Sequence, residues 1–220
     1  MFVIQGEHMT RLILIRHGFS VYNKERRFSG HADVPLDEVG LLQAREVAEY
    51  VTKSFNVDAV YSSDLSRAYE TVRGIAEAFS LSVIKRRELR ELDVGVWQGR
   101  PVSEIAEEYP EEFTLFKTNV GRYRPVGGES YEEMMKRVMY EIHRIVAENK
   151  GKTVVIGTHG GVIRVIRAFI KGLSLDEIKT LSHVPNASVT ILEETNGVLS
   201  IAVEGYNEYI TQKTTEIKLK

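Results

Sequence analysis

Short apolar runs alternate with longer segments of helical periodicity along most of this chain. The runs are rich in β-branched residues and end at charged or turn residues, as expected of strands covered on both faces. They occupy residues 12–15, 59–61, 83–84 and 154–156. Apolar residues recur every three or four positions in 41–54, 65–79 and 131–149, and a further helix is expected after "THGG". This alternation predicts a three-layer α/β/α sandwich with a mainly parallel central sheet.

Polar residues at the ends of these segments suggest where helices begin and where strands turn. Ser63 or Asp64 is available to cap the helix at 65–79, and Glu129 or Ser130 precedes the helix at 131–149. Near the C-terminus, "ASVTILEE" and "GVLSIAVE" flank "TNG". That arrangement predicts a hairpin that adds antiparallel edge strands to the sheet.

Two stretches do not fit the alternating pattern. Residues 100–128 contain Pro101, Pro110 and Pro125 between short helical pieces, which indicates an inserted segment or lid rather than a second domain. The charged tail, residues 206–220, is expected to be partly mobile. We therefore predict one domain spanning residues 1–220 with a single short helical insertion.

Composition narrows the functional classes. The 220 residues are 43% hydrophobic, enough to bury a sizeable core, and the net charge of −2 predicts no general nucleic-acid or membrane surface. The absence of cysteine excludes disulfides and thiolate chemistry, and no apolar run approaches the roughly 20 residues that span a bilayer. The N-terminal residues lack the pattern of a signal peptide, so we expect a cytoplasmic protein; Met9 is an alternative start to Met1.

Three familiar signatures fail on inspection. "NKGKT" resembles the end of a P-loop, but Val146 stands where the earlier glycine belongs and a strand follows. "GTHGGV" lacks the dinucleotide-binding glycine pattern because His159 occupies the loop. "GGESYE" is not a nucleophile elbow, since Glu132 replaces the closing glycine.

Charged residues instead collect where the predicted strands end. Arg16 and His17 follow the first strand, Arg67 follows the second, Glu91 comes shortly after the third, and His159 follows the fourth. The carboxyl ends of parallel strands form one rim, where ligands of open α/β sheets bind. Singly, each residue is more readily a cap or a surface group. Together they would be costly as mere scaffold, because polar groups that meet without partners lose their hydration.

The same residues allow two kinds of site. His17, His159 and Glu91, with Asp33 as a fourth ligand, could bind a metal ion, but Arg16 and Arg67 would then repel the dication. A multiply charged anion suits two arginines better. Guanidinium groups match phosphate oxygens in pairs, and the backbone N–H groups after His159, beginning at Gly160, can bind the same anion. The rim therefore predicts a phosphoryl site without metal.

Six segments carry a specific resemblance, in order: "RHGFSVYN", "FSGHADVPLDEVGLLQA", "VYSSDLSRAYET", "ELDVGVWQG", "GGES" and "GTHGGVIR". Over roughly 11–204 the chain resembles the histidine phosphatase superfamily, the phosphoglycerate-mutase-like proteins. The resemblance implies an α/β/α sandwich and phosphohistidine chemistry that needs no metal or other cofactor. It implies these roles: His17 as nucleophile, Arg16, Arg67 and His159 as the phosphate clamp, Asn23 as an auxiliary phosphate ligand, and Glu91 as proton donor.

The implied chemistry is reasonable for these residue types. A nucleophilic His17 must be neutral, and two neighbouring arginines pull its pKa below the reference value of about 6.5. One ring nitrogen can then attack phosphorus while the other is held, we expect, by a backbone hydrogen bond. Gly18 is expected to permit a tight turn beside the anion. Glu91 would protonate the leaving oxygen and then take a proton from water.

The resemblance covers both hydrolases and mutases. Mutases of the family continue the acid motif with arginine, histidine, tyrosine and glycine and carry a longer basic insertion, whereas Glu91 here precedes "LDVGVW". Val94 in the tyrosine position, and an insertion offering only Arg122, Arg124 and Pro125, favour a phosphatase that admits water. A cofactor-dependent phosphoglycerate mutase is the alternative, followed by a non-catalytic phosphometabolite-binding module.

The expected partner is a small phosphorylated metabolite, with no nucleic acid and no membrane, and a homodimer is left open. Relatives act on phosphoserine, α-ribazole phosphate, sugar phosphates and other small esters. Residues expected at the substrate mouth are Ser29, Gly30, His31, Val94, Trp97, Arg122 and His183. His183, in "SHVPNAS", is equally compatible with hydrogen bonding inside its loop.

Overall fold

Six strands form the central sheet of the computed structural model, which describes residues 9–119 and 121–214. They are β1 (Thr10–Arg16), β2 (Ala59–Ser62), β3 (Val83–Lys85), β4 (Thr153–Thr158), β5 (Val189–Thr195) and β6 (Val198–Tyr206). Across the sheet they follow the order β3-β2-β4-β1-β5-β6. β1 to β4 run parallel, β5 is antiparallel to β1, and β6 is antiparallel to β5. The mainly parallel sheet is confirmed; of the two hairpin strands only β6 lies at an edge.

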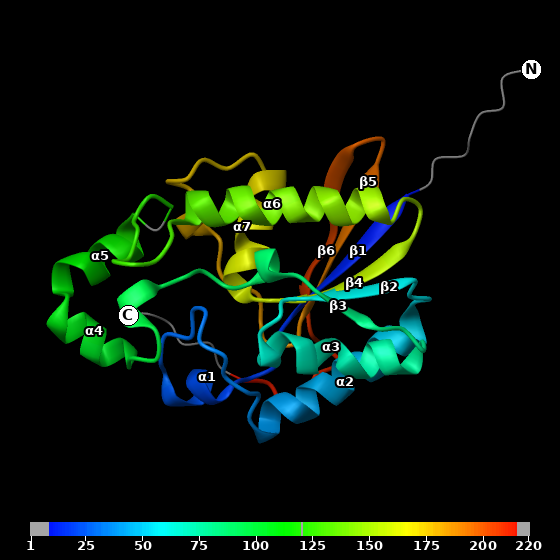
Figure 1. Ribbon diagram of the computed structural model, residues 1–220, viewed down its shortest axis with the longest axis horizontal. Helices are drawn as coiled ribbons and strands as arrows, with labels where there is room; N and C mark the ends of the chain where they lie inside the picture. Colours follow the sequence, from blue (N-terminus) through cyan, green and yellow to red (C-terminus); the bar gives the residue numbers. More distant parts are fainter. Residues whose placement is uncertain (1–8, 120, 215–220) are drawn as a thin grey trace, which may run out of the picture.

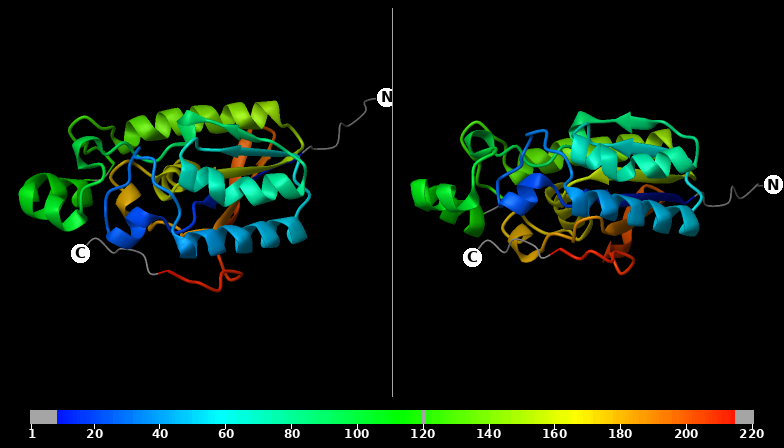
Figure 2. Two further views of the ribbon diagram at one scale, coloured as in Figure 1. Left: turned by 60° about the horizontal axis from the view of Figure 1, so that its bottom comes forward. Right: turned by 90° about the horizontal axis from the view of Figure 1, so that it is seen from below.

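Helices cover both faces of this sheet (Figure 1). They are α1 (Val21–Glu25), α2 (Glu38–Ser54), α3 (Ser66–Ala78), α4 (Val102–Glu108), α5 (Pro110–Thr118), α6 (Tyr131–Glu148) and α7 (Gly160–Ile170), with 3-10 turns at Arg87–Leu89, Gly95–Trp97 and Ile178–Thr180. α2 and α3 lie on one face and α6 and α7 on the other (Figure 2). The predicted three-layer sandwich is therefore confirmed.

Alternation along β1 builds two separate cores. Leu12 and Leu14 pack with the buried side chains of α6 and α7, whereas Ile13 and Ile15 pack with those of α2 and α3. All four are fully buried. Successive strand residues point to opposite faces, so a strand covered on both sides must be apolar at every position. This explains why the first apolar run is continuous.

The residue that caps α6 is one that the sequence predicts, whereas the predicted caps of α3 are wrong. Ser130 caps α6, and its side chain and that of Glu133 form a reciprocal capping box. At α3 the cap prediction is corrected: the N-cap is Leu65, and Ser66 N–H donates to Asp33 Oδ1 at 2.7 Å. Asp64 instead receives two hydrogen bonds from Arg90. The carboxylate that caps α3 thus comes from a distant loop.

The segment 100–128 contributes two short helices, α4 and α5, at one end of the molecule (Figure 1). Aromatic rings join it to the loop after β1: Trp97 lies 5.3 Å from Phe28 and 5.4 Å from Phe116, between ring centroids. Ring pairs at such distances stabilise beyond their buried area. The helical insertion is therefore packed onto the body of the fold.

The C-terminal segment departs from the expectation of mobility as far as residue 214. The ring of Tyr209 stacks on Tyr50 at 4.3 Å with an angle of 7° between planes, and its hydroxyl donates to the Ala187 carbonyl. Ile210 is buried, and Gln43 donates to the Gln212 carbonyl. Apolar contacts and hydrogen bonds therefore hold this segment against α2. Residues 215–220 lie outside the described part of the chain.

In the part of the chain that the structure describes, no helix combines the length and the apolar character needed to traverse a lipid bilayer.

The contact of Tyr209 with α2 predicts a stability effect. Replacing Tyr209 by Ala removes the stacked ring and its hydrogen bond, and should lower the free energy of unfolding by about 2 kcal/mol in urea titrations. Tyr140→Ala is the matched control, because Tyr140 is 68% exposed and its loss should cost less than about 0.5 kcal/mol. Equal effects of the two substitutions would show that the segment contributes no stabilising contact.

Candidate active site

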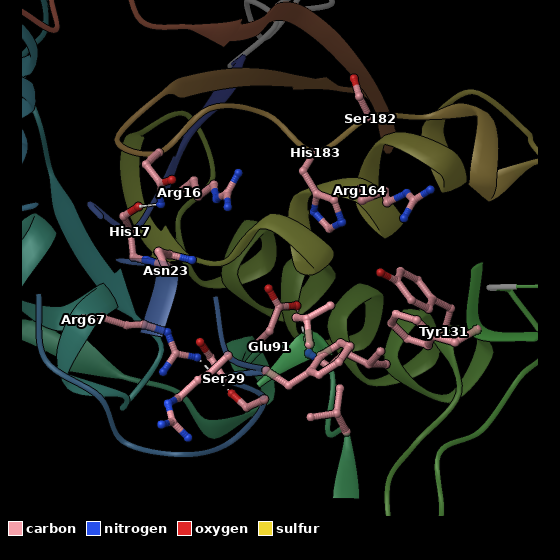
Figure 3. Close-up of a pocket in the computed structure, with 18 of the residues that line it drawn as sticks. Arg16, His17, Asn23, Ser29, Arg67, Glu91, Tyr131, Arg164, Ser182 and His183 are labelled. Carbon is pink, nitrogen blue, oxygen red and sulfur yellow. Dashed lines mark hydrogen bonds between the residues drawn. The ribbon is translucent and has the colours of Figure 1, made fainter. Parts of the chain in front are cut away.

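A cavity of about 610 Å³ lies at the carboxyl end of β1 (Figure 3). Nine residues expected at the site line it: Arg16, His17, Asn23, Ser29, Gly30, Arg67, Glu91, Val94 and His183. His159 lies directly behind this lining, with its ring centroid 5.2 Å from that of His17. Residues from the ends of four strands therefore meet, as parallel strand ends predict.

His17 is held in one orientation by the backbone that follows it. Its Nδ1 lies 2.7 Å from the Gly18 carbonyl oxygen, so Nδ1–H donates and Nε2 keeps its lone pair. Burial, followed by the charges of Arg67 and Arg16, lowers the pKa of His17 well below 6.5. A neutral imidazole with one free nitrogen is a nucleophile at neutral pH. The expected backbone hydrogen bond is confirmed.

Gly18 allows the chain to pass close to the backbone of α2, whereas a tight turn was expected at this position. A Cβ on Gly18 would lie 2.7 Å from the Gly40 carbonyl oxygen, at the start of α2. The Gly18 N–H donates to Thr71 Oγ1 at 2.9 Å. The loop bearing His17 is therefore pressed between α2 and α3.

His159 has an unused hydrogen-bonding ring directly behind the cavity lining. Its side chain is fully buried, and neither ring nitrogen has a hydrogen-bond partner in the described part of the chain. Burial, followed by the charge of Arg67, lowers the pKa of His159 well below 6.5. A buried imidazole without a partner is costly, so a ligand atom is the natural partner.

Arg67 is fixed before any ligand arrives. It is fully buried, and its terminal amino groups donate to the carbonyls of Ala32 at 2.8 Å and Gly30 at 2.9 Å. Burial lowers the pKa of Arg67 to about 10, which leaves the guanidinium charged at neutral pH. Arg16 Nη1 donates to the Val184 carbonyl from the other side of His17. Two oriented positive charges thus flank the imidazole.

Glu91 is positioned through its side chain and its main chain. One carboxylate oxygen accepts from Leu92 N–H at 2.9 Å, and the other accepts from Gly161 N–H at 3.1 Å. Its carbonyl oxygen accepts from Arg137 Nη2 at 2.9 Å and from His31 Nε2 at 2.8 Å. A Cβ on Gly161 would overlap the carboxylate, so any side chain there would have to displace it.

Asn23 is oriented by the short helix α1. Its Oδ1 accepts from the backbone N–H and the hydroxyl of Ser20, both at 3.0 Å, within a capping box. Because the oxygen is occupied, the Nδ2 amino group is left for the cavity, where Figure 3 places this side chain. An amide donor beside His17 suits an anion.

Three residues expected at the substrate mouth, Trp97, Arg122 and His31, do not line the cavity. Asp33, the fourth ligand of the alternative metal site, does not line it either. Trp97 is 1% exposed inside the aromatic cluster, and Arg122 lies on the surface beside Asp176. His31 supports Glu91 from behind, as described above. Asp33 caps α3, and the described residues contain no group of three His, Asp or Glu side chains that could hold a metal ion.

His183 belongs to the cavity wall. It is half-buried between Arg16 and Arg164, and desolvation followed by these two charges lowers its pKa to about 3. A Cβ on Gly160 would lie 2.7 Å from His183 Nδ1, so the glycine lets the imidazole lie close to the start of α7. His183 is therefore a neutral donor or acceptor at neutral pH.

Sequence reasoning missed Asn186, Tyr131 and Arg164, which also line the cavity. Asn186 Nδ2 donates to the His17 carbonyl at 3.0 Å and so fixes the loop that bears the imidazole. The signal for Asn186 was its position in "SHVPNAS", and that for Arg164 its place in "GTHGGVIR". The sequence gives no signal for Tyr131, because it cannot be told from the other apolar residues of its helix.

Comparison with known proteins agrees with this geometry. The model of the histidine phosphatase superfamily (branch 1) matches residues 12–206. "Phosphoglycerate mutase-like protein 4" of Arabidopsis thaliana is 40% identical over 70% of this chain and 67% of its own length. "Metal-independent phosphoserine phosphatase" of the same plant is 37% identical over 84% and 76%. The structure of Bacillus stearothermophilus YhfR has a TM-score of 0.87 and 32% identity over 91% of this chain and 99% of that one.

The buried histidines predict a pH-dependent stability. The folded-state pKa values of His17, His159 and His183 lie below 6.5, so the unfolded chain binds more protons as the pH falls below that value. Urea titrations between about pH 7 and pH 5.5 should therefore show a falling free energy of unfolding, by up to about 1.4 kcal/mol per pH unit for each histidine. His159→Gln should make this dependence shallower, whereas the exposed control His143→Gln should retain the wild-type slope.

Proposed function

The chain belongs to the histidine phosphatase superfamily (branch 1), and on this basis we propose that it hydrolyses small phosphate monoesters without a metal, through a phosphohistidine formed on His17. The observation that carries the proposal is the hydrogen bond from His17 Nδ1 to the Gly18 carbonyl oxygen, which leaves Nε2 unprotonated beside two arginines. The expected partner is a small phosphorylated metabolite.

In the first step the Nε2 lone pair of His17 attacks phosphorus and the ester P–O bond breaks. Glu91 gives its proton to the leaving oxygen, so the product alcohol departs neutral. Arg16, Arg67 and His159 stabilise the charge on the phosphoryl oxygens, with Asn23 and the Gly160 N–H as further donors. Oriented donors in a buried site can supply the electrostatic stabilisation that a metal supplies elsewhere.

In the second step the carboxylate of Glu91 takes a proton from water, and the water oxygen attacks phosphorus. The P–N bond to His17 breaks, and inorganic phosphate leaves with its charge balanced by the arginines. Glu91 is thereby protonated again and the imidazole returns to its neutral form. The two hydrogen bonds to the Glu91 carboxylate hold it in place for both proton transfers.

The surroundings of the cavity favour water over a second substrate as the acceptor. Val94, in the position of the mutase tyrosine, lines the cavity. Arg122 and Arg124, which a mutase would use to retain its substrate, form ion pairs with Asp176 and Glu133 on the outside. The similarity to the plant protein named metal-independent phosphoserine phosphatase also supports hydrolysis.

The direct test uses a panel of phosphate monoesters in the presence of EDTA. Wild-type protein should release phosphate, His17→Ala should lose at least about a thousandfold in kcat, and the exposed control His143→Ala should remain active. An acid-labile, base-stable phosphoprotein should form on the wild type and on His143→Ala, but not on His17→Ala. Activity that requires added metal would refute the mechanism, and faster interconversion of phosphoglycerates than phosphate release would identify a mutase. Ligand binding without turnover would identify a binding module.

A substitution at Gly161 tests whether Glu91 is the proton donor. Gly161→Ala should displace the Glu91 carboxylate, which accepts its N–H, and kcat/KM for an alkyl phosphate should fall about a hundredfold. The loss should be far smaller for p-nitrophenyl phosphate, whose leaving group departs without a proton. Gly74→Ala is the control, since a Cβ there meets only Ala48 Cβ at 3.4 Å. Equal losses on both esters would argue against Glu91 as the proton donor.

A further inference from the structure

The cavity contains more positive charge than one phosphate group requires. Among the described residues that line it, Glu91 is the one carboxylate, and six residues are cationic. These are Arg16, Arg27, Arg67, Arg164, Lys117 and Lys179. Arg16 and Arg67 flank His17, so Arg164 is not needed for the phosphoryl group. The excess charge points to a ligand that carries a second anionic group.

Arg164 lies on a different wall of the cavity from the phosphoryl site. Figure 3 shows Arg16, His17, Asn23 and Arg67 on one side, and Arg164 with Tyr131 on the other. Glu91 and His183 lie between the two groups. A ligand that reaches both walls therefore passes the proton donor.

The contacts of Arg164 leave most of its donors for a ligand. Its Nε donates to the Ile178 carbonyl at 3.1 Å, and its guanidinium group forms a hydrogen bond with the Tyr131 side chain, with its carbon 5.6 Å from the centre of the Tyr131 ring. A guanidinium has five N–H groups in a planar fork. Within the described part of the chain, no carboxylate lies at ion-pair distance from Arg164, although its side chain is only 9% exposed.

A neighbour on the same helix shows what this chain does with an ordinary buried arginine. Arg167 is 5% exposed and forms an ion pair with Glu204. Arg67 and Arg164 are the other buried arginines among the described residues; both lack such a pair, and both line the cavity. A buried charge without a partner is strongly destabilising. Arg67 is assigned to the phosphate, so Arg164 calls for an anion of its own.

We propose that Arg164 and Tyr131 form a second anion subsite that binds the carboxylate of a phosphorylated carboxylic acid. This assignment rests on the proposed phosphatase function and names its substrate class. A carboxylate is planar and singly charged, and it accepts two parallel N–H bonds from one guanidinium. The apolar side chains of Leu92, Val94 and Phe116 also line the cavity, which suits the short carbon skeleton of such an acid.

His183 keeps the two subsites chemically distinct. The positive charges of Arg16 and Arg164 both act on its ring. His183 is uncharged at neutral pH because its pKa is lowered to about 3. A neutral ring between two guanidinium groups adds no charge to either subsite. Each arginine can therefore be assigned its own anion, the dianionic phosphoryl group at Arg16 and the carboxylate at Arg164.

Matched esters test the subsite. Phosphoserine and O-phosphoethanolamine differ only by the carboxylate, and 3-phosphoglycerate and glycerol 3-phosphate differ by a carboxylate in place of a hydroxymethyl group. The wild type should prefer the acid of each pair in kcat/KM. Arg164→Gln should reduce this preference about 10- to 100-fold, mainly through KM, since hydrogen bonds to charged groups are of that strength. Arg164→Lys should restore part of it.

Arg122→Gln is the matched control, because Arg122 is an arginine of the insertion that pairs with Asp176 outside the cavity. It should leave the preference for the acid unchanged. If Arg122→Gln loses the preference for the acid and Arg164→Gln keeps it, the carboxylate binds at the insertion and the assignment to Arg164 is wrong. An equal loss of both esters in Arg164→Gln, or a wild type that does not distinguish them, would also overturn it.

Binding separates this assignment from the proposed reaction. In the His17→Ala background, calorimetry should show tighter binding of 3-phosphoglycerate than of glycerol 3-phosphate, and Arg164→Gln should abolish the difference. If no ester is hydrolysed but this difference is found, the phosphatase proposal fails and the subsite stands. If esters are hydrolysed and the difference is absent, the subsite alone fails. Thermal unfolding followed by circular dichroism checks that each variant is folded.

Discussion

The parallel pairing of β1 with β4 determines most distances in the site. Arg16 lies opposite Thr158 in this register, so His17 and His159 leave the sheet side by side. Their rings are 5.2 Å apart at an angle of 60°, and the His17 N–H donates to the Thr158 carbonyl at 2.8 Å. A shift of one residue would turn these side chains to opposite faces of the sheet. Packing on the two faces of β1 opposes such a shift, because Leu12 and Leu14 fill one core and Ile13 and Ile15 the other.

Charge at this rim is tolerated because the histidines are neutral. Arg67 is fully buried and remains charged, and each nearby imidazole disfavours a proton for the same two reasons, burial and that charge. Hydrogen bonds to the Ala32 and Gly30 carbonyls compensate part of the cost of burying the guanidinium. The rest of that cost is offset when an anion binds. The arrangement that keeps His17 neutral thus also makes the site favourable for an anion.

Much of this could be predicted from sequence because it depends on local rules. Strand ends and helix periodicity place Arg16, His17, Glu91 and His159 at one rim without knowledge of any contact. The cap of α3 could not be predicted, since Asp33 approaches Ser66 through tertiary structure. For the same reason Trp97 appeared as a mouth residue although the insertion covers it. The importance of Arg164 depends on which side of α7 faces the cavity, and periodicity cannot distinguish that side in a helix whose residues are nearly all buried.

Glu91 is held by elements that do not include the insertion. Its carboxylate is bound by the first turn of α7, and its carbonyl by Arg137 of α6 and by His31. Arg137 is itself held by two hydrogen bonds to Glu129. The insertion helices supply Val102, Phe116 and Lys117 to the cavity wall and no contact to this carboxylate among the described residues. Residues of α4 and α5 can therefore change the shape of the cavity without changing any of these contacts of Glu91.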